Sequence, residues 1–155
     1  MTTLRVYLKR MHKALGESIA WPTRMSTHAA GFDLAAAIDA PVQLEPGQRR
    51  LLPTGFAMAF SPGFEAQIRA RSGLALKHGV TVLNSPGTID SDYRGEIKVL
   101  LINHGQEPFV INPGDRIAQM VFAQVMTPGF EVVTHLDEGQ DAGARGTGGY
   151  GSTGI

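Results

Sequence analysis

Apolar residues alternate with polar residues in several short segments, which is the pattern of half-buried β-strands. The pattern is clearest over residues 64–71, where Phe, Ala, Ile and Ala alternate with Glu, Gln and Arg. Residues 4–9 alternate in the same way, and residues 109–111 and 117–125 predict further strands. Residues 99–102 are continuously apolar and predict a strand that is buried on both faces.

Turn signals separate these segments at short intervals. Pro-Gly pairs occur at residues 46–47, 62–63, 86–87, 113–114 and 128–129. Short strands punctuated in this way are typical of an all-β sandwich or barrel.

One short helix is predicted within the β pattern, with Ser72 as its N-cap and Gly79 at its end. Residues 137–155 change to a polar, Gly-rich composition. We therefore expect one β domain over residues 1–136 and a flexible C-terminal arm over residues 137–155.

Composition narrows the function classes. The chain has 155 residues, enough for one domain, and 14 Lys and Arg balance 14 Asp and Glu. Zero net charge argues against nucleic acid or an anionic membrane as a partner, although a local cluster can still hold a small anion. The chain has no cysteine, no signal-peptide pattern and no apolar run near the roughly 20 residues of a membrane span. We expect a cytoplasmic protein.

The C-terminal segment combines flexibility with chemistry. Six of the twelve residues 143–154 are glycine, yet the segment carries Arg145, Tyr150, Ser152 and Thr153. A cation, an aromatic ring, hydroxyls and bare backbone N–H groups suit a phosphorylated ligand that contains a ring. Composition alone favours a disordered chain end. The glycine spacing also matches the dinucleotide fingerprint, but too few residues follow it to form the required helix.

Residues 69–75, Arg-Ala-Arg-Ser-Gly-Leu-Ala, form a second cluster. Arg69 and Arg71 leave a strand on one face, and Ser72 starts the predicted helix. Guanidinium groups and helix N-termini both bind phosphate. An arginine pair that solvates a strand, followed by an ordinary Ser cap, fits the same residues.

Acidic residues form the remaining candidates. Asp90 and Asp92 share one face if their segment is extended, and carboxylates in such a place bind a cation, orient a water or, most commonly, cap a turn. Asp33 lies among apolar residues and needs an arginine or a metal as its partner. Gln119 is the polar exception in an apolar strand. The five histidines have no metal-ligand spacing.

Taken together and in this order, five segments resemble the motifs of the trimeric dUTP pyrophosphatase (dUTPase) family. They are AAGFDL (29–34), RARSGLA (69–75), GTIDSDYRGE (87–96), GDRIAQMVF (114–122) and RGTGGYGSTG (145–154). They span nearly the whole chain at the spacing of that family.

The resemblance implies a jelly-roll-like barrel that assembles as a homotrimer with three shared sites. Each site is built from three subunits, and the C-terminal arm of one subunit closes over a site formed by the other two. The implied reaction is hydrolysis of dUTP to dUMP and pyrophosphate with Mg²⁺, which keeps uracil out of DNA and supplies dUMP for thymidylate synthesis.

The resemblance also implies residue roles. Asp90 is the catalytic residue that orients a water for in-line attack on the α-phosphorus, and Asp33 holds Mg²⁺ through water. Tyr93 packs on the deoxyribose, and a hairpin over residues 80–87 presents Asn84 to the uracil. The remaining substrate contacts fall on Arg71, Ser72, Gly73, Gly87, Thr88, Ile89, Lys98, Gln119, Arg145, Tyr150, Gly151, Ser152 and Thr153.

One position departs from the family pattern, because residue 150 is commonly phenylalanine and is tyrosine here. Stacking on uracil survives this change. Asp92 and Arg94 lie inside a motif, and salt-bridge or turn roles fit them as well as catalysis. Two competing functions are a dCTP deaminase, which shares the fold and some motifs, and a non-catalytic nucleotide-sensing protein on the same scaffold.

Overall fold

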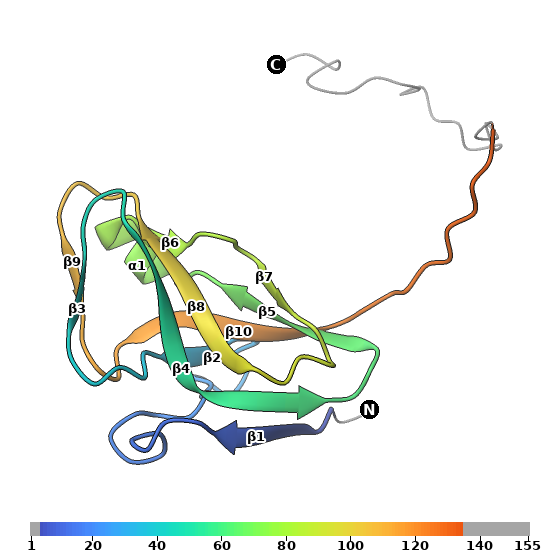
Figure 1. The fold of residues 1–155 in the computed structure, drawn as a ribbon, viewed down its shortest axis with the longest axis horizontal. Helices are drawn as coiled ribbons and strands as arrows, with labels where there is room; N and C mark the ends of the chain where they lie inside the picture. Colours follow the sequence, from blue (N-terminus) through green and yellow to red (C-terminus); the bar gives the residue numbers. More distant parts are fainter. Residues whose placement is uncertain (1–3, 135–155) are drawn as a thin grey trace.

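The protein forms two packed antiparallel β-sheets, and the computed structural model describes residues 4–134 (Figure 1). One sheet has the spatial order β1 (Val6–Arg10), β4 (Arg49–Phe60), β8 (Glu96–Asn103), β6 (Val80–Val82). The other has the order β2 (Phe32–Ala35), β10 (Arg116–Gln124), β5 (Phe64–Arg69), β7 (Gly87–Ile89). A small third sheet pairs β3 (Val42–Leu44) with β9 (Phe109–Ile111). This arrangement confirms the predicted all-β, jelly-roll-like fold. The expected C-terminal arm lies outside the described residues.

The core lies between the two four-stranded sheets. In β5, Ala66 and Ile68 are buried while Glu65 and Gln67 are not, as the alternation predicts. From the other sheet, Val99 and Leu101 of β8 enter the same apolar cluster.

The prediction that β8 is buried on both faces is wrong. Leu100 and Ile102 are half-buried, because they point away from the core on the outer face of their sheet. Leu51 of β4 is opposite Leu100 and is 58% exposed. The continuous apolar run therefore reflects a second apolar face that the single protomer leaves open.

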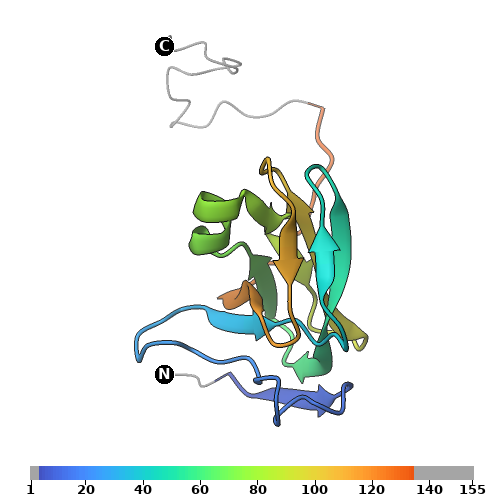
Figure 2. The ribbon, with the colours of Figure 1, turned by 90° about the vertical axis from the view of Figure 1, so that its left-hand side faces the viewer.

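The N-terminal strand is present but less buried than predicted. In β1, Val6 is half-buried and the other four residues are exposed, Leu8 included. β1 pairs only with the second half of β4, at the edge of its sheet. Figure 2 shows β1 and the following connection at one end of the molecule and the helix near the other.

The single helix of the described chain, α1 (Ser72–His78), begins one residue earlier than its predicted capping implies. Arg71 occupies the N-cap position and no side chain caps the helix, so the predicted cap at Ser72 is wrong. Gly79 ends the helix in the left-handed conformation with φ 67°, as predicted, and its N–H bonds the carbonyls of Leu74 and Ala75. Within residues 4–134, no helix combines the length and apolar character that crossing a membrane requires.

The predicted hairpin over residues 80–87 is a connection between sheets. β6 pairs with β8, whereas β7 pairs with β5, so the two strands that flank residues 83–86 do not pair with each other. Alternation predicts which face a strand buries, and it does not specify the partner strand. The connection therefore carries the chain from one sheet to the other.

Asn103, at the end of β8, is fully buried and fastens two loops. Its Nδ2 donates to the carbonyls of Leu44 at 2.9 Å and Glu107 at 2.8 Å, and its Oδ1 accepts from the Gly105 N–H at 2.8 Å. Removing this side chain leaves buried backbone groups without partners.

We expect Asn103→Ala to lower the free energy of unfolding by about 2–4 kcal/mol, because each orphaned buried group costs roughly 1–3 kcal/mol. Guanidinium denaturation at fixed protein concentration measures the change. Asn112→Ala is the matched control, since Asn112 is exposed and its side chain contacts Asp115 at 3.3 Å. A loss at Asn103 as small as that of the control would contradict this role.

Candidate active site

Three neighbouring strands bring an acidic, an amide and a basic side chain into one row. Gln119 of β10 is opposite Asp33 of β2 on one side and opposite Arg69 of β5 on the other. Directly opposed residues in an antiparallel sheet share a face. Residues that are 36 to 86 positions apart in the sequence therefore lie together on the outer side of this sheet.

Asp33 is held by two arginines. Nη1 of Arg116 donates to Oδ2 of Asp33 at 3.0 Å, and Nη2 of Arg71 lies 3.5 Å from the same oxygen. Nη1 of Arg71 also donates to the carbonyl of Arg116 at 2.9 Å. Because only 16% of the Asp33 side chain is exposed, the carboxylate needs this compensating charge. The predicted requirement for a partner at Asp33 is confirmed, and the partners are arginines.

These side chains line an open cleft of about 510 Å³, which we call the arginine cleft. Its walls are Met25, Ala29, Ala30, Gly31, Asp33, Arg69, Arg71, Ser72, Gly73, Arg116, Gln119 and Val121. Three guanidinium groups face one carboxylate, which leaves a local formal charge of plus two. A cleft of this charge suits a polyanion such as a phosphate chain.

Gln119 fixes the loop that leads from β5 to α1. Its Nε2 donates to the carbonyl of Ala70 at 2.9 Å. Its amide lies over Gly31, where an added Cβ would approach Cδ of Gln119 to 3.3 Å and Oε1 more closely still. The glycine thus makes room for the amide that positions the Arg71–Ser72 segment.

Ser72 and Gly73 are exposed at the start of α1, on the wall of the same cleft. An added Cβ at Gly73 would meet nothing within 4 Å, so the backbone here is open to a ligand. Arg69 is held differently from Arg71, through two bonds to Oε1 of Gln67 at 3.1 and 2.6 Å.

The predicted catalytic residue lies in a different cleft, which we call the aspartate cleft. It has a volume of about 280 Å³ and is lined by Leu51, Thr88, Ile89, Asp90, Tyr93, Glu96 and Lys98. Asp90 follows the end of β7 and is exposed. Nζ of Lys98 lies 3.9 Å from Oε2 of Glu96, so the positive charge of Lys98 is partly compensated.

The turn after Asp90 is closed by several hydrogen bonds. The N–H of Tyr93 donates to the carbonyl of Asp90 at 3.2 Å. Nη1 of Arg94 donates to the carbonyls of Ser91 at 2.7 Å and Tyr93 at 2.9 Å. Arg94 therefore makes turn contacts, which is one of the roles that the sequence leaves open for it.

Asp90 also borders a wider groove of about 800 Å³, together with Glu65 and Asp92. Within residues 4–134, no Lys or Arg lines this groove. Asp92 thus adds negative charge beside Asp90 in this groove.

Asn84 and Gly87 lie in the connection between β6 and β7. An added Cβ at Gly87 would come within 3.2 Å of Nδ2 of Asn84 and 3.4 Å of Cβ of Ile68. The glycine therefore lets the Asn84 amide approach the backbone, while Asn84 itself stays exposed.

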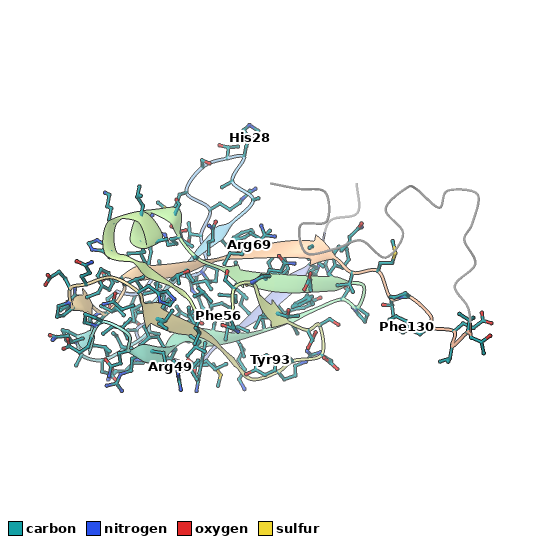
Figure 3. All side chains as sticks on the ribbon, turned by 90° about the horizontal axis from the view of Figure 1, so that it is seen from above. His28, Arg49, Phe56, Arg69, Tyr93 and Phe130 are labelled. Carbon is teal, nitrogen blue, oxygen red and sulfur yellow. The ribbon has the colours of Figure 1, made fainter. Side chains whose placement is uncertain are left out.

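The structure does not bring all predicted site residues together in one protomer. In the part of the chain that the structure describes, the arginine cleft and the aspartate cleft share no lining residue. In Figure 3, Arg69 and Tyr93, one from each cleft, lie on different sides of the molecule. Arg145, Tyr150, Gly151, Ser152 and Thr153 lie outside the described residues.

Arg116 is the residue that sequence reasoning missed. It stands in the segment GDRIAQMVF, which the pattern indicates as a turn that enters a core strand. Its pairing with Asp33 depends on β10 lying beside β2, a non-local pairing. The available signal was a basic residue three positions before Gln119.

Comparisons with known proteins agree with the sequence motifs. A family model described as dUTPase matches residues 17–154. The deoxyuridine 5'-triphosphate nucleotidohydrolase of Syntrophotalea carbinolica is 52% identical over 156 residues and is covered in full, as is this chain. The enzyme of the same name from Maricaulis maris is 52% identical over 157 residues, which cover 100% of this chain and 99% of that protein.

Solved structures show the same fold. A mutant dUTPase of Staphylococcus bacteriophage 80alpha with dUpNHpp superposes with a TM-score of 0.82 at 22% identity, covering 97% of this chain and 99% of that one. A mutant dUTPase of phage phi11 of S. aureus, which coordinates a structural Mg(II) ion, has a TM-score of 0.74 at 22% identity, covering 84% and 97%. Because a family model and full-length relatives at 52% identity agree, this chain belongs to the dUTPase family.

Proposed function

We propose that the protein hydrolyses dUTP to dUMP and pyrophosphate, so that it limits uracil entry into DNA and supplies dUMP. Membership of the dUTPase family and relatives with that activity in their names support this reaction. The observation that carries it is the separation of two complementary clefts: one has three arginines and the other has an exposed carboxylate beside an aromatic ring.

The arginine cleft is proposed to bind the phosphate chain. Arg71 and Arg116 are already oriented by Asp33, so little side-chain freedom is lost when a phosphate binds. The Ser72 hydroxyl and the open backbone at Gly73 add uncharged donors at the same wall. Gln119 contributes by holding the loop that carries these residues.

Asp90 is proposed to orient the attacking water. A carboxylate is a weak base, so positioning of the water and neutralisation of phosphate charge supply most of the acceleration. The water oxygen forms a bond to the α-phosphorus, the bond from that phosphorus to the bridging oxygen breaks, and pyrophosphate leaves. Asp90 accepts a hydrogen bond from the water and stabilises the proton that the water releases.

Mg²⁺ is the proposed cofactor, as a structural relative that coordinates Mg(II) suggests. Among residues 4–134 there is no group of three or more His, Cys, Asp or Glu that could hold a metal ion. Asp33 offers one carboxylate that is already shared with two arginines, which fits contact through water better than direct binding. When bound, the ion neutralises and orients the phosphate chain, and Asp33 is the residue proposed to hold it.

The nucleoside is proposed to lie in the aspartate cleft and along the connection after β6. Asn84 and backbone groups near Gly87, Thr88 and Ile89 present hydrogen-bonding atoms for the uracil edge. Tyr93 offers its ring to the deoxyribose, and Lys98 borders the same cleft.

We further propose that clefts from different subunits combine in a homotrimer. Of the residues among 4–134 that line the two clefts around Asp90, Lys98 is the only Lys or Arg, which supports a contribution of arginines from another copy of the chain. Leu51, Leu100 and Ile102 form an apolar outer face on β4 and β8 that a second copy can cover. This face adjoins the aspartate cleft, because Leu51 lines both.

The segment that follows β10 supports an arm directed to a neighbour. Residues 126–134 leave the sandwich, and Figure 1 shows them extending away from both sheets. Phe130 is 94% exposed and is labelled far from the body of the molecule in Figure 3. Residues 137–155, with Arg145 and Tyr150, are proposed to close over a site of the trimer. The cytoplasmic location and the lack of nucleic-acid and membrane partners stay predictions from the sequence.

A nucleotide panel with pyrophosphate detection tests the reaction. We expect the full-length protein with Mg²⁺ to release pyrophosphate and dUMP from dUTP, and to turn over UTP, dCTP and dTTP at least about a hundredfold more slowly. Release of ammonia from dCTP would instead support the deaminase. Tight dUTP binding without turnover would support a nucleotide-sensing protein.

A further inference from the structure

Gly95 lies directly against the ring of Tyr93. An added Cβ at Gly95 would lie 2.6 Å from Cζ and 3.1 Å from Cε2 of Tyr93, and closer still to its hydroxyl oxygen. Real Cβ atoms do not make contacts below 3.0 Å, so the ring can occupy this place only over a glycine. The tyrosine therefore folds back onto the turn that carries it.

The backbone does not explain this glycine. The described glycines with positive φ are Gly16, Gly47, Gly55, Gly63, Gly79 and Gly114, and Gly95 is not among them. An alanine can adopt the local backbone conformation at residue 95 without strain. The space that the Tyr93 ring occupies is therefore the reason that the structure offers for glycine here.

The hydroxyl end of the ring, which lies over Gly95, is also anchored to a fixed point. The Tyr93 hydroxyl donates to the carbonyl of Glu96 at 3.1 Å. Glu96 opens β8, and its Oε1 accepts from the N–H of Gly55 in β4 at 3.0 Å. Gly95 beneath the ring and Glu96 at its tip together define one orientation, while Tyr93 stays 45% exposed toward the aspartate cleft.

We propose that Gly95 is a specificity-determining positioning residue, which seats Tyr93 so that its ring forms the wall against a 2′-hydroxyl. The proposal rests on the proposed function, in which Tyr93 packs on the deoxyribose. A ribonucleotide is excluded only if the Tyr93 ring is held close to the sugar. Because Gly95 has no side chain, the ring can pack against its backbone and stay in that position. Gly95 acts through Tyr93 and does not touch the substrate itself.

The substitution Gly95→Ala separates this role from folding. Tyr93 is exposed on its outer side and its ring is the end of a flexible side chain, so the ring moves and the backbone does not. We expect kcat/KM for dUTP relative to UTP to fall about tenfold or more, in the range by which small steric changes alter discrimination. KM for dUTP rises more than kcat falls, and the melting temperature changes little.

A double-mutant cycle tests whether Gly95 acts through Tyr93. The full-length protein is assayed with dUTP and UTP as Gly95→Ala, Tyr93→Ala and the double variant. We expect the double variant to discriminate between dUTP and UTP as well as Tyr93→Ala alone, because Gly95 has no ring to position once Tyr93 is removed. Tyr93→Phe keeps the ring and loses the bond to Glu96, so its effect is expected to be smaller than that of Gly95→Ala.

Three results would overturn the proposal, and they differ from one another. If Tyr93→Ala lowers discrimination between dUTP and UTP but Gly95→Ala does not, the contact of Tyr93 with the sugar is supported and the positioning role of Gly95 is refuted. If Tyr93→Ala leaves discrimination unchanged, the proposed contact with deoxyribose fails and the role of Gly95 fails with it. If Gly95→Ala lowers kcat equally for both nucleotides and adds to Tyr93→Ala, the glycine serves the Asp90 turn in general.

Discussion

Asp90→Asn is expected to lower kcat for dUTP hydrolysis by about a thousandfold while dUTP binding is retained. General acid–base groups contribute roughly 10²–10⁴-fold to catalysis, and the neutral amide neither polarises a water nor stabilises its released proton. Binding survives because the arginines proposed to face the phosphates lie in a separate cleft. Single-turnover kinetics and titration with a non-hydrolysable dUTP analogue measure the two effects separately.

Asp92→Asn is the matched control for Asp90. It removes the same charge from the same turn, and both residues border the same groove. We expect its kcat to stay within about threefold of the unmodified protein, because the general electrostatic effect of an exposed carboxylate is small. Equal losses at both positions, or lost binding with normal turnover of bound substrate, would refute the role assigned to Asp90.

Mixed trimers of two inactive variants are expected to regain activity. Arg71→Ala impairs the arginine cleft, and we expect it to lower kcat/KM about a hundredfold or more, since it removes a proposed charge-assisted phosphate contact and leaves Arg116 as the remaining arginine partner of Asp33. Asp90→Asn impairs the aspartate cleft of its own chain. If each site takes one cleft from each of two subunits, a mixed trimer contains some sites with both clefts intact.

The size of the recovery is set by how the subunits combine. Each mixed trimer has one site that combines an intact arginine cleft with an intact aspartate cleft, so about a third of the sites in the mixed assemblies are intact. Co-expression of the two variants with different affinity tags, followed by purification on both tags, isolates the mixed assemblies. Recovery near this level supports shared sites, and activity no higher than that of either variant alone would show that each protomer builds its own site.

Local patterns predicted much of the fold. Alternation over residues 64–69 identified β5 and its buried face, because the side-chain period of a strand is two. Gly79 was placed correctly at the end of α1, since a left-handed residue there favours glycine. The motif resemblance named Asp33, Arg71, Ser72 and Gln119 as site residues, and these four residues line the same cleft.

Non-local pairing accounts for what sequence reasoning missed. The alternation of side chains predicts which face of a strand is buried, but it does not predict which strand lies beside it. Nothing in the local sequence therefore indicates that β2 lies beside β10 and that Arg116 reaches Asp33. The same limit produced the error at residues 80–87, where flanking strands join different sheets. Leu100 was predicted to be buried because it is apolar, and the single protomer leaves its face open.

In the proposed trimer, the apolar outer face of β4 and β8 would link catalysis to protein concentration. If Leu100 and Ile102 are covered only by other copies of the chain, dilution below the dissociation constant separates the clefts that must meet around one nucleotide. Specific activity then falls on dilution although every protomer remains folded. A polar residue at Leu100, which lines neither cleft, would shift that threshold upward, and in a trimer with shared sites the assembly equilibrium would set the lowest concentration at which the protein works.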